Sequence, residues 1–271
     1  INGEHTTYDE AIYIIDVLTE HAVEWLDNRE QDQPFFMYLS HKAVHSQFEP
    51  AKRHEGIYEN EAIVYPPSFN VPSYGIPELP TLGTDSEPLR GRDYYGDRRI
   101  PDWVKHQRES WHGVDYMYHG DINFEDFFQR YTETLMGIDD SVGEVLDYLD
   151  ANGLAEDTLV IYMGDNGFSF GEHGLIDKRH FYEESAKVPL IVRWPSQLRG
   201  GTPIEALVQN IDIAPTILEA AGLKSPPHMQ GSSFAPLLTR EDIPWRDRIF
   251  YEYYWEMDFP QTPTMFGIRT E

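Results

Sequence analysis

One succession of patterns restricts the possible fold more than any other feature of the sequence: a strong helical pattern runs into an apolar segment and then a polar loop. Apolar residues recur at steps of three and four over 131–149, which is typical of a helix packed on one face. Asn152-Gly153 is a signal for the end of that helix. The apolar segments TLVIYMG (158–164) and KVPLIVRWP (187–195) predict two buried strands.

The same alternation extends toward both ends of the chain. The patterns predict a helix over 16–28 capped by Asp16, a buried strand over 34–40, and a short helix over 211–222 capped by Asp212 and ended by Gly222. Strands that alternate with helices favour an α/β fold with a mostly parallel sheet sandwiched by helices.

A long central stretch lacks any clear period. Residues 51 to about 120 are rich in proline, glycine, tyrosine and charge, and we interpret the region at about 51–130 as an insertion. Loops of this length in a compact domain are usually functional or disordered.

The composition excludes several classes of protein. With 21 Lys and Arg against 47 Asp and Glu, the formal net charge is −26, which repels nucleic acid and anionic lipid. A local cluster of cations can still bind an anionic small molecule. The chain has no cysteine, so disulfides and thiolate metal sites are absent. No apolar run approaches the roughly 18 residues that span a bilayer.

The polar loop after residues 158–164 begins with Asp165 and Asn166. A carboxylate oxygen beside an amide oxygen forms a hard donor pair, which suits Ca²⁺ or Mg²⁺ better than Zn²⁺. Gly167 allows the backbone to turn there. The alternative interpretation is that Asp-Asn-Gly is only a favourable turn.

Basic side chains gather further along this loop. Lys178, Arg179 and His180 stand in a row and could hold a tetrahedral anion, although Arg179 fits a solvated surface position better. His173 could donate a proton or contact a substrate. In parallel sheets, ligands bind where strands end, so the loop after residues 34–40 could meet the same anion through His45.

Taken together, these segments resemble the sulfatases of the alkaline phosphatase-like superfamily. PFFMYLSHKAVHSQFEP is similar to the family's strand and histidine loop, and the residues from RYTETL to GDNG resemble its long helix, strand and metal segment. GEHGLIDKRHFYEESAKVPLIVRWP is similar to its lysine loop and next strand. The matches cover roughly half of the residues, and their shared order makes the resemblance specific.

The resemblance implies a role for each matching residue. Asp165 and Asn166 would bind a divalent metal, Ca²⁺ in most of the family, with Mg²⁺ as the alternative. Lys178 would contact the sulfate and the nucleophile, while His45 would bind the sulfate and protonate the leaving alcohol. His173 would lie near the substrate as a further catalytic residue. We also expect Lys42 and His180 to bind substrate.

The sequence also departs from the family pattern. Sulfatases use a formylglycine made from the first residue of Cys/Ser-x-Pro-Ser/Ala-Arg, and that motif belongs upstream of every segment matched here. SEPLR, 86–90, is out of order and has Leu in the fourth place. We therefore expect that the N-terminal nucleophile segment is missing and that the chain alone is inactive. Residues 1–240 would be the C-terminal portion of the catalytic domain, and 241–271 the truncated start of a C-terminal subdomain.

Two other functions stay open. A phosphatase or phosphodiesterase of the same superfamily often has histidine where Asn166 stands, so Asn166 favours the sulfatase. A non-catalytic carbohydrate-binding relative would explain the missing nucleophile. The expected substrate is a sulfated carbohydrate or a small sulfate ester, and no nucleic-acid partner is expected. Family analogy suggests a periplasmic or secreted location, and the sequence does not determine the oligomeric state.

Overall fold

The computed structural model assigns the chain to two compact units, residues 1–64 with 122–155 and residues 65–121 with 156–271. The structure describes residues 6–9, 12–45, 48–69, 98, 102–109, 124–173, 175–201, 203–239, 243–258 and 262–270.

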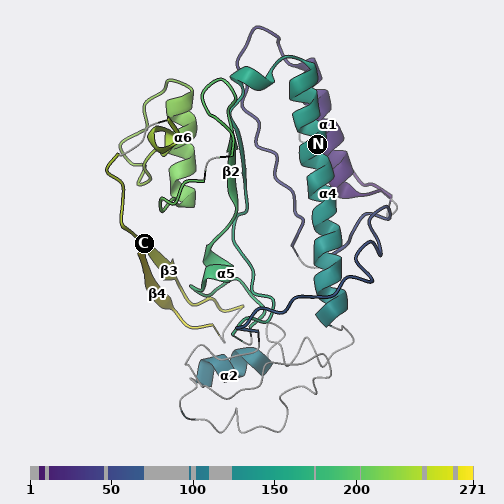
Figure 1. Cartoon of the computed structure of the whole chain (residues 1–271), viewed down its shortest axis with the longest axis vertical. Coiled ribbons are helices and arrows are strands. Elements are labelled where there is room, and N and C mark those ends of the chain that lie inside the picture. The colour runs from purple at the N-terminus through teal and green to yellow at the C-terminus, as the bar shows by residue number, and fades with distance from the viewer. Residues whose placement is uncertain are drawn as a thin grey trace. The chain divides into compact units, whose positions relative to one another are not determined.

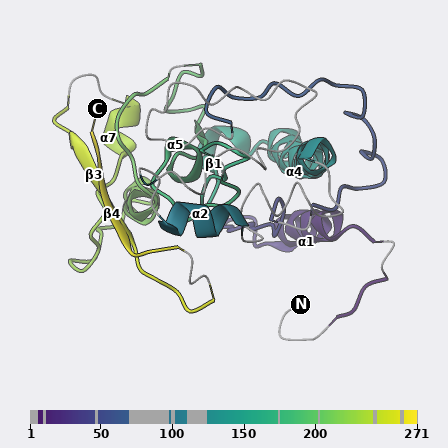
Figure 2. The ribbon, with the colours of Figure 1, turned by 90° about the horizontal axis from the view of Figure 1, so that it is seen from below.

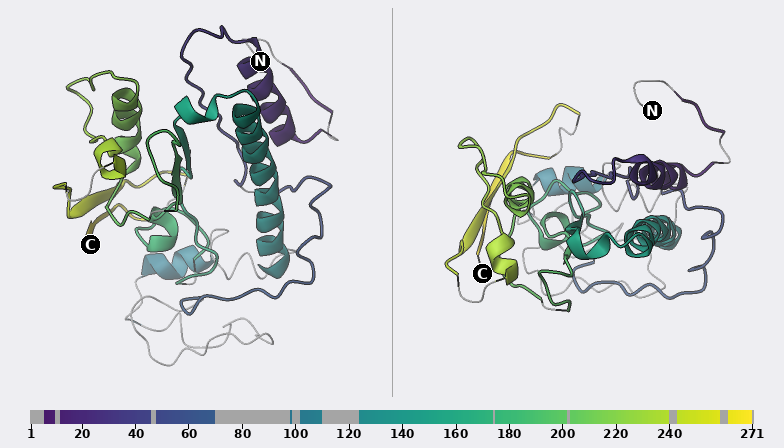
Figure 3. Two further views of the ribbon diagram at one scale, coloured as in Figure 1. Left: turned by 45° about the horizontal axis from the view of Figure 1, so that its top comes forward. Right: turned by 90° about the horizontal axis from the view of Figure 1, so that it is seen from above.

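The first unit is built on two long helices that lie side by side (Figures 1 and 3). Helix α1 (Ile14–Asn28) packs on helix α4 (Phe124–Ala151). Thr19 of α1 donates a hydrogen bond of 2.6 Å to Ser141 of α4 inside this contact. Gly137 lets the helices approach, because a Cβ there would lie 2.7 Å from the ring of Tyr13.

The helical pattern predicted α4 well and α1 less well. Gly153 has a φ of 68°, and Leu154 donates from its backbone to the carbonyl oxygen of Leu149, so α4 ends as predicted. Helix α1 begins at Ile14 instead, and Asp16 lies in its first turn, where it binds Arg53 over 2.8 Å. The prediction that Asp16 caps the helix was wrong, because an ion pair from a distant segment takes its carboxylate.

Residues 34–40 do not form the predicted strand. They are extended, and side chains alternate between half-buried and exposed, with Phe36 65% and Tyr38 83% exposed. A strand needs a neighbour to receive its hydrogen bonds, and the part of the chain that the structure describes offers this segment no pairing strand. The prediction of a buried strand at 34–40 was therefore wrong.

The predicted insertion is shorter and less irregular than expected. Helix α4 already begins at Phe124, and helix α2 (Asp102–Glu109) lies within the stretch that showed no period. Residues 70–97 and 110–123, including the SEPLR sequence at 86–90, lie outside the described residues.

The second unit contains two antiparallel strand pairs among its described residues. Strand β1 (Val160–Met163) follows the 3₁₀ turn η1 (Ala155–Asp157) and pairs with β2 (Leu190–Arg193), with Met163 opposite Leu190. The expectation of parallel pairing fails here. The residues between β1 and β2 fold back on themselves with only the four-residue helix α5 (Glu183–Ala186), which is too short to carry a parallel crossover.

The remaining elements of this unit follow β2 along the chain. They are the 3₁₀ turn η2 (Asn210–Asp212), α6 (Ile213–Ala220), α7 (Ala235–Thr239), β3 (Arg248–Tyr253) and β4 (Met265–Thr270). Strands β3 and β4 form a hairpin that Figure 2 shows as two neighbouring arrows. Gly222 has a φ of 72° just after α6, as predicted for its end.

Asp212 stands at the N-cap position of α6 as predicted, but its side chain does not cap the helix. Its side chain is completely buried and makes no cap hydrogen bond to the helix. The carboxylate instead accepts from the backbone N–H groups of Gln209 and Ser232, each over 2.8 Å, and from both terminal nitrogens of Arg246 over 2.6 and 2.8 Å. It therefore joins three separate segments around α6.

Candidate active site

The Asp165–Asn166 turn begins two residues after β1 ends. Asp165 is exposed, and its carboxylate accepts the backbone N–H of Asn166 over 2.9 Å. The side-chain amide nitrogen of Asn166 donates to the carbonyl oxygen of Gly167 over 2.7 Å, so the amide oxygen is the atom that a cation would meet. Both residues thus have a side-chain oxygen that could bind a cation just after the C-terminal end of β1.

Two further segments fix this turn. The backbone N–H of Gly167 donates to the carbonyl oxygen of Ser185 over 2.8 Å, and a Cβ on Gly167 would overlap the carbonyl oxygen of Glu184. The side chain of Asn210 donates to the carbonyl oxygen of Asp165 over 3.0 Å. No sequence pattern indicated a role for Asn210, because 45 residues separate it from Asp165.

The basic part of the loop is more buried than its composition indicates. Asp177 is only 2% exposed, and its carbonyl oxygen accepts the backbone N–H of Ser169 over 2.9 Å. Lys178 is half-buried. Arg179 forms an ion pair of 2.5 Å with Asp177, so the interpretation of Arg179 as a solvated surface residue was wrong. The backbone next to Lys178 is therefore packed within the loop.

His173 lies in a polar and aromatic cluster. Its backbone has a φ of 57°, its N–H donates to Ser68 over 2.8 Å, and its ring stacks on Tyr182 at 4.1 Å between centroids. Its Nε2 lies 3.7 Å from a carboxylate oxygen of Glu184. Burial lowers the pKa of His173, and the Glu184 carboxylate partly offsets that shift. A neutral imidazole with a carboxylate beside it can exchange a proton.

Glu172 is a further titratable residue of the candidate site, and the sequence did not predict it. Burial raises the pKa of its carboxyl group, and Glu184 adds to the rise, while the backbone N–H of Phe170, which donates over 2.5 Å, opposes it. The Glu184 carboxylate lies beside the His173 ring, and Glu172 precedes His173 in the chain. Neither has a sequence signal, since acidic residues are abundant throughout this chain.

His180 is almost completely buried, with 1% of its surface exposed. Its ring stacks on Trp103 of α2, with 5.9 Å between ring centroids, and lies 6.1 Å from the ring of Tyr182. Its role in substrate binding stays a prediction. Any such contact would involve a ring that is already packed between aromatic side chains.

The second predicted loop belongs to the first unit. Lys42 and His45 are both exposed, and the backbone N–H of His45 donates to the carbonyl oxygen of Lys42 over 2.9 Å, which closes a turn. His41 anchors this turn, because its Nε2 lies 3.1 Å from the hydroxyl of Ser141 on α4. Burial lowers the pKa of His41.

The structure thus gathers some predicted residues and leaves others apart. Asp165, Asn166, His173, Lys178 and His180 all lie on the β1–β2 connection of the second unit. Lys42 and His45 lie in the first unit, so their convergence with the others on one pocket stays a prediction.

The described residues do not by themselves make up a complete metal site. Among the described residues, no group of three or more His, Asp or Glu side chains is arranged to hold a metal ion. Ca²⁺ takes six to eight oxygen ligands, so Asp165 and Asn166 fit it as part of a shell that other groups must complete.

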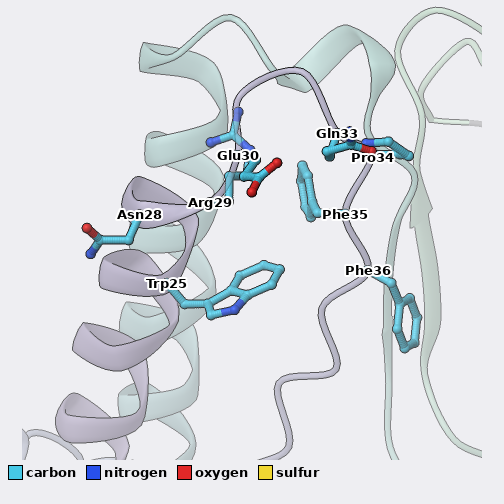
Figure 4. Close-up of a pocket in the computed structure, with 8 residues that line it drawn as sticks. All are labelled: Trp25, Asn28, Arg29, Glu30, Gln33, Pro34, Phe35 and Phe36. Carbon is cyan, nitrogen blue, oxygen red and sulfur yellow. The ribbon is translucent and has the colours of Figure 1, made fainter.

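A pocket of about 390 Å³ lies in the first unit, and none of these residues lines it (Figure 4). It is lined by Trp25, Asn28, Arg29, Glu30, Gln33, Pro34, Phe35 and Phe36. Trp25 meets Phe35 edge-on, and the guanidinium of Arg29 lies 5.5 Å from the centroid of that Phe35 ring. Its aromatic lining carries none of the residues predicted for chemistry.

Comparison with known proteins finds sulfatases among the relatives of this chain. Residues 171–271 match the family described as N-sulphoglucosamine sulphohydrolase, C-terminal. All of this chain aligns with 54% of the N-acetylglucosamine-6-O-sulfatase of Bacteroides thetaiotaomicron, at 30% identity over 309 positions. The chain is a relative of the sulfatases. It spans 54% of that relative and 40% of the N-acetylglucosamine-6-sulfatase of Bos taurus, to which it is 31% identical. A part of the chain, 42% of it, is 34% identical to 10% of the extracellular sulfatase SULF-1 homolog of Drosophila melanogaster.

Solved structures confirm the fold class. One solved structure is that of a protein in complex with its substrate, D-glucosamine-2-N,6-O-disulfate. The match covers 99% of the present chain and 61% of the solved chain, with a TM-score of 0.76 and 28% identity. A phosphonate monoester hydrolase from Silicibacter pomeroyi matches 90% of this chain and 44% of its own, with a TM-score of 0.65 and 22% identity, which shows a shared fold alone. The chain therefore has part of an α/β, alkaline phosphatase-like sulfatase core.

Proposed function

We propose that the complete polypeptide containing this chain hydrolyses a sulfate ester on a sulfated carbohydrate. One observation carries the proposal: the Asp165–Asn166 turn and the Lys178 loop are joined by backbone contacts in a chain that aligns over its whole length with an N-acetylglucosamine-6-O-sulfatase. That relative's name and the disulfated glucosamine bound to the structural relative support an amino sugar sulfate as substrate.

Asp165 and Asn166 would contribute oxygen ligands to a divalent ion, Ca²⁺ by preference and Mg²⁺ as the alternative. The ion would supply electrostatic stabilisation of the sulfate oxygens. The nucleophile, expected to be formylglycine, would come from the part of the protein upstream of this chain. These assignments rest on the donor chemistry and on the family resemblance.

The cationic and titratable residues would bind the sulfate and transfer protons. Lys178 would hold the sulfate through its ammonium group, and it follows the buried, hydrogen-bonded Asp177 in the loop. His45 would protonate the leaving alcohol, and general acid catalysis of this kind typically contributes about 10²–10⁴-fold. His173 would exchange protons near the substrate, while Lys42 and His180 would contact it.

Domain organisation and location follow the same resemblance. We propose that residues 1–240 belong to the catalytic domain and that 241–271 begin a C-terminal subdomain. A periplasmic or secreted location is supported by relatives named extracellular sulfatases. No helix among the described residues is long and apolar enough to cross a bilayer.

Sulfate release by the complete polypeptide tests the proposal. With 6-O-sulfated N-acetylglucosamine as substrate, Lys178→Ala should lower kcat/KM by about 10²–10³-fold, since it removes a charged donor from the transition state. Lys187→Ala is the matched control, because Lys187 is exposed just after α5.

Three results would count against this function. Equal activity of the Lys178→Ala and Lys187→Ala proteins would remove the proposed role of the loop. A higher kcat/KM on the corresponding phosphate monoester or phosphonate monoester than on the sulfate would favour the phosphatase alternative. Binding of the sulfated sugar with no sulfate release, in a protein whose formylglycine is present, would favour a non-catalytic relative.

A further inference from the structure

The inner face of the β3–β4 hairpin contacts the loop that carries Lys178. Side chains along β3 and β4 alternate between half-buried and exposed positions. The half-buried set includes Tyr251 and Gly267, which are direct cross-strand partners, and Arg269. The exposed set, which includes Phe250 and Ile268, lies on the opposite face.

Tyr251 makes two contacts with the Lys178 loop. Its hydroxyl donates a hydrogen bond of 2.9 Å to the carbonyl oxygen of Arg179. Its ring stacks on Phe181, with centroids 4.5 Å apart and planes only 7° from parallel. Burial raises the pKa of Tyr251, and the Asp177 carboxylate adds to the rise, so the phenol stays protonated as a donor.

Gly267 provides the space that this stack needs. A Cβ at position 267 would overlap the ring of Phe181. The Phe181 ring therefore lies directly against the backbone of Gly267 and beside the ring of its cross-strand partner, Tyr251. An aromatic ring that covers a strand glycine fills the space that a side chain would otherwise occupy.

Lys178 is held on both sides by these contacts. Before it, Asp177 is buried and its carbonyl oxygen accepts from Ser169. After it, the carbonyl oxygen of Arg179 accepts from Tyr251. Further along, Arg269 of β4 donates to Glu183 at the start of α5 over 2.6 Å. The backbone of Lys178 thus has one anchor within the loop and another on the hairpin.

We propose that Tyr251, Phe181 and Gly267 form a positioning device that sets where the Lys178 ammonium points. The hairpin would act through Lys178 and not touch the substrate itself. This inference rests on the proposed function, because it assigns a purpose to the position of a residue that the proposal places at the sulfate.

Tyr251→Phe in the complete polypeptide tests the hydrogen bond without removing the aromatic stack. Loss of one net hydrogen bond should lower kcat/KM by about 3–10-fold and raise the inhibition constant for inorganic sulfate by a similar factor. Tyr254→Phe is the matched control, because the Tyr254 hydroxyl bonds only weakly, over 3.4 Å, to exposed Glu252. That variant should match the unaltered enzyme.

Gly267→Ala tests the stack from the other strand. Its methyl group should displace Phe181 and the loop behind it, and a misplacement of about 1 Å can cost about 10²-fold in rate. If this variant does not fold, Tyr251→Phe still decides the question, since it only deletes an oxygen atom.

The deciding measurement repeats Tyr251→Phe in a Lys178→Ala background. If Tyr251 acts through Lys178, the second change should lower kcat/KM no further, because residues in one unit are not additive. An equal fall in both backgrounds, or no difference between Tyr251→Phe and Tyr254→Phe, would overturn the inference and leave the proposed function intact. Full activity of Lys178→Ala alone would overturn the proposed role of Lys178, and this inference with it.

Discussion

The backbone N–H of Gly167 donates to the carbonyl oxygen of Ser185 over 2.8 Å, which binds the turn after β1 to the end of the Lys178 loop. Through this bond the two oxygen donors Asp165 and Asn166 and the cation of Lys178 belong to one folded piece of chain. A substitution at Gly167 would measure how much this connection contributes to the stability of the protein.

Gly167→Ala should separate the turn from the loop. Its Cβ would overlap the carbonyl oxygen of Glu184, and backbone cannot rotate away as a side chain can. Overpacking of this kind typically costs about 1–3 kcal/mol, which thermal unfolding would record as a lower Tm. Gly200→Ala is the control, because a Cβ there meets nothing within 4 Å. Equal Tm values for both variants would contradict the close approach.

The buried pair of Asp212 and Arg246 should contribute strongly to stability. Asp212→Ala would leave a guanidinium that is only 20% exposed without its carboxylate, and two backbone N–H groups without their acceptor. Removal of one partner from such a pair typically costs about 3–5 kcal/mol, readable in denaturant unfolding.

Asp247→Ala provides the comparison for that measurement. Asp247 pairs with Arg248 over 2.7 Å, but both side chains are more than half exposed. Solvent screens such pairs, so their removal changes little. A similar loss of stability in the Asp212→Ala and Asp247→Ala proteins would show that burial does not distinguish the two pairs.

Local patterns predicted the elements whose boundaries depend on neighbouring residues. The apolar steps of α4 and its end at Gly153 were both readable, because helix periodicity and a left-handed glycine are local properties. The polar turn after β1 was equally readable from its composition.

Pairing between distant segments could not be read in the same way. The apolar run at 34–40 looks like a strand whether or not a neighbour exists, and the direction of the β1–β2 pair depends on how their connection folds. Likewise, Asn210 at Asp165 and Tyr251 at Arg179 are joined by single hydrogen bonds over 45 and 72 positions. Such contacts leave no periodic signal in a sequence.

His173 should make the protein less stable in mild acid. Burial lowers its pKa below the ordinary value of about 6.5, so the unfolded chain binds more protons just below that pH. Stability is therefore complete above about pH 6.5 and falls as the pH drops. His173→Gln should reduce the fall in Tm between pH 7.5 and 5.5, and only partly, because the pKa of His41 is lowered in the same direction. An unchanged fall would contradict the burial of His173.

Glu172 provides a test with the opposite sign. Because its pKa is raised in the folded chain, the folded state binds more protons above about pH 4.5, and stability is lost as the pH rises through that range. Glu172→Gln removes this contribution, so the fall in Tm from pH 7.5 to 4.5 should become larger, whereas His173→Gln should make the fall over the same range smaller. The two neighbouring substitutions should thus move the same measurement in opposite directions. If both substitutions changed the fall in Tm in the same direction, the pKa of either Glu172 or His173 would not be shifted as burial predicts.

Removal of divalent metal should reveal whether Asp165 is a ligand. A chelator should lower the Tm of the complete polypeptide, and Ca²⁺ at about 100 times its Kd should restore about 2.7 kcal/mol of stability. Asp165→Ala should lose most of this response, because an exposed carboxylate in front of β1 is the hardest donor of the turn.

Asp157→Ala is the control for this metal response, since Asp157 is equally exposed but lies before β1 in η1. It should keep the full stabilisation by Ca²⁺. Mg²⁺ at the same concentration should stabilise the protein less than Ca²⁺ does. Mg²⁺ requires near-ideal octahedral geometry, which a turn with one carboxylate and one amide ligand does not impose. Equal stabilisation of the Asp165→Ala and Asp157→Ala proteins by Ca²⁺ would exclude Asp165 from the metal site.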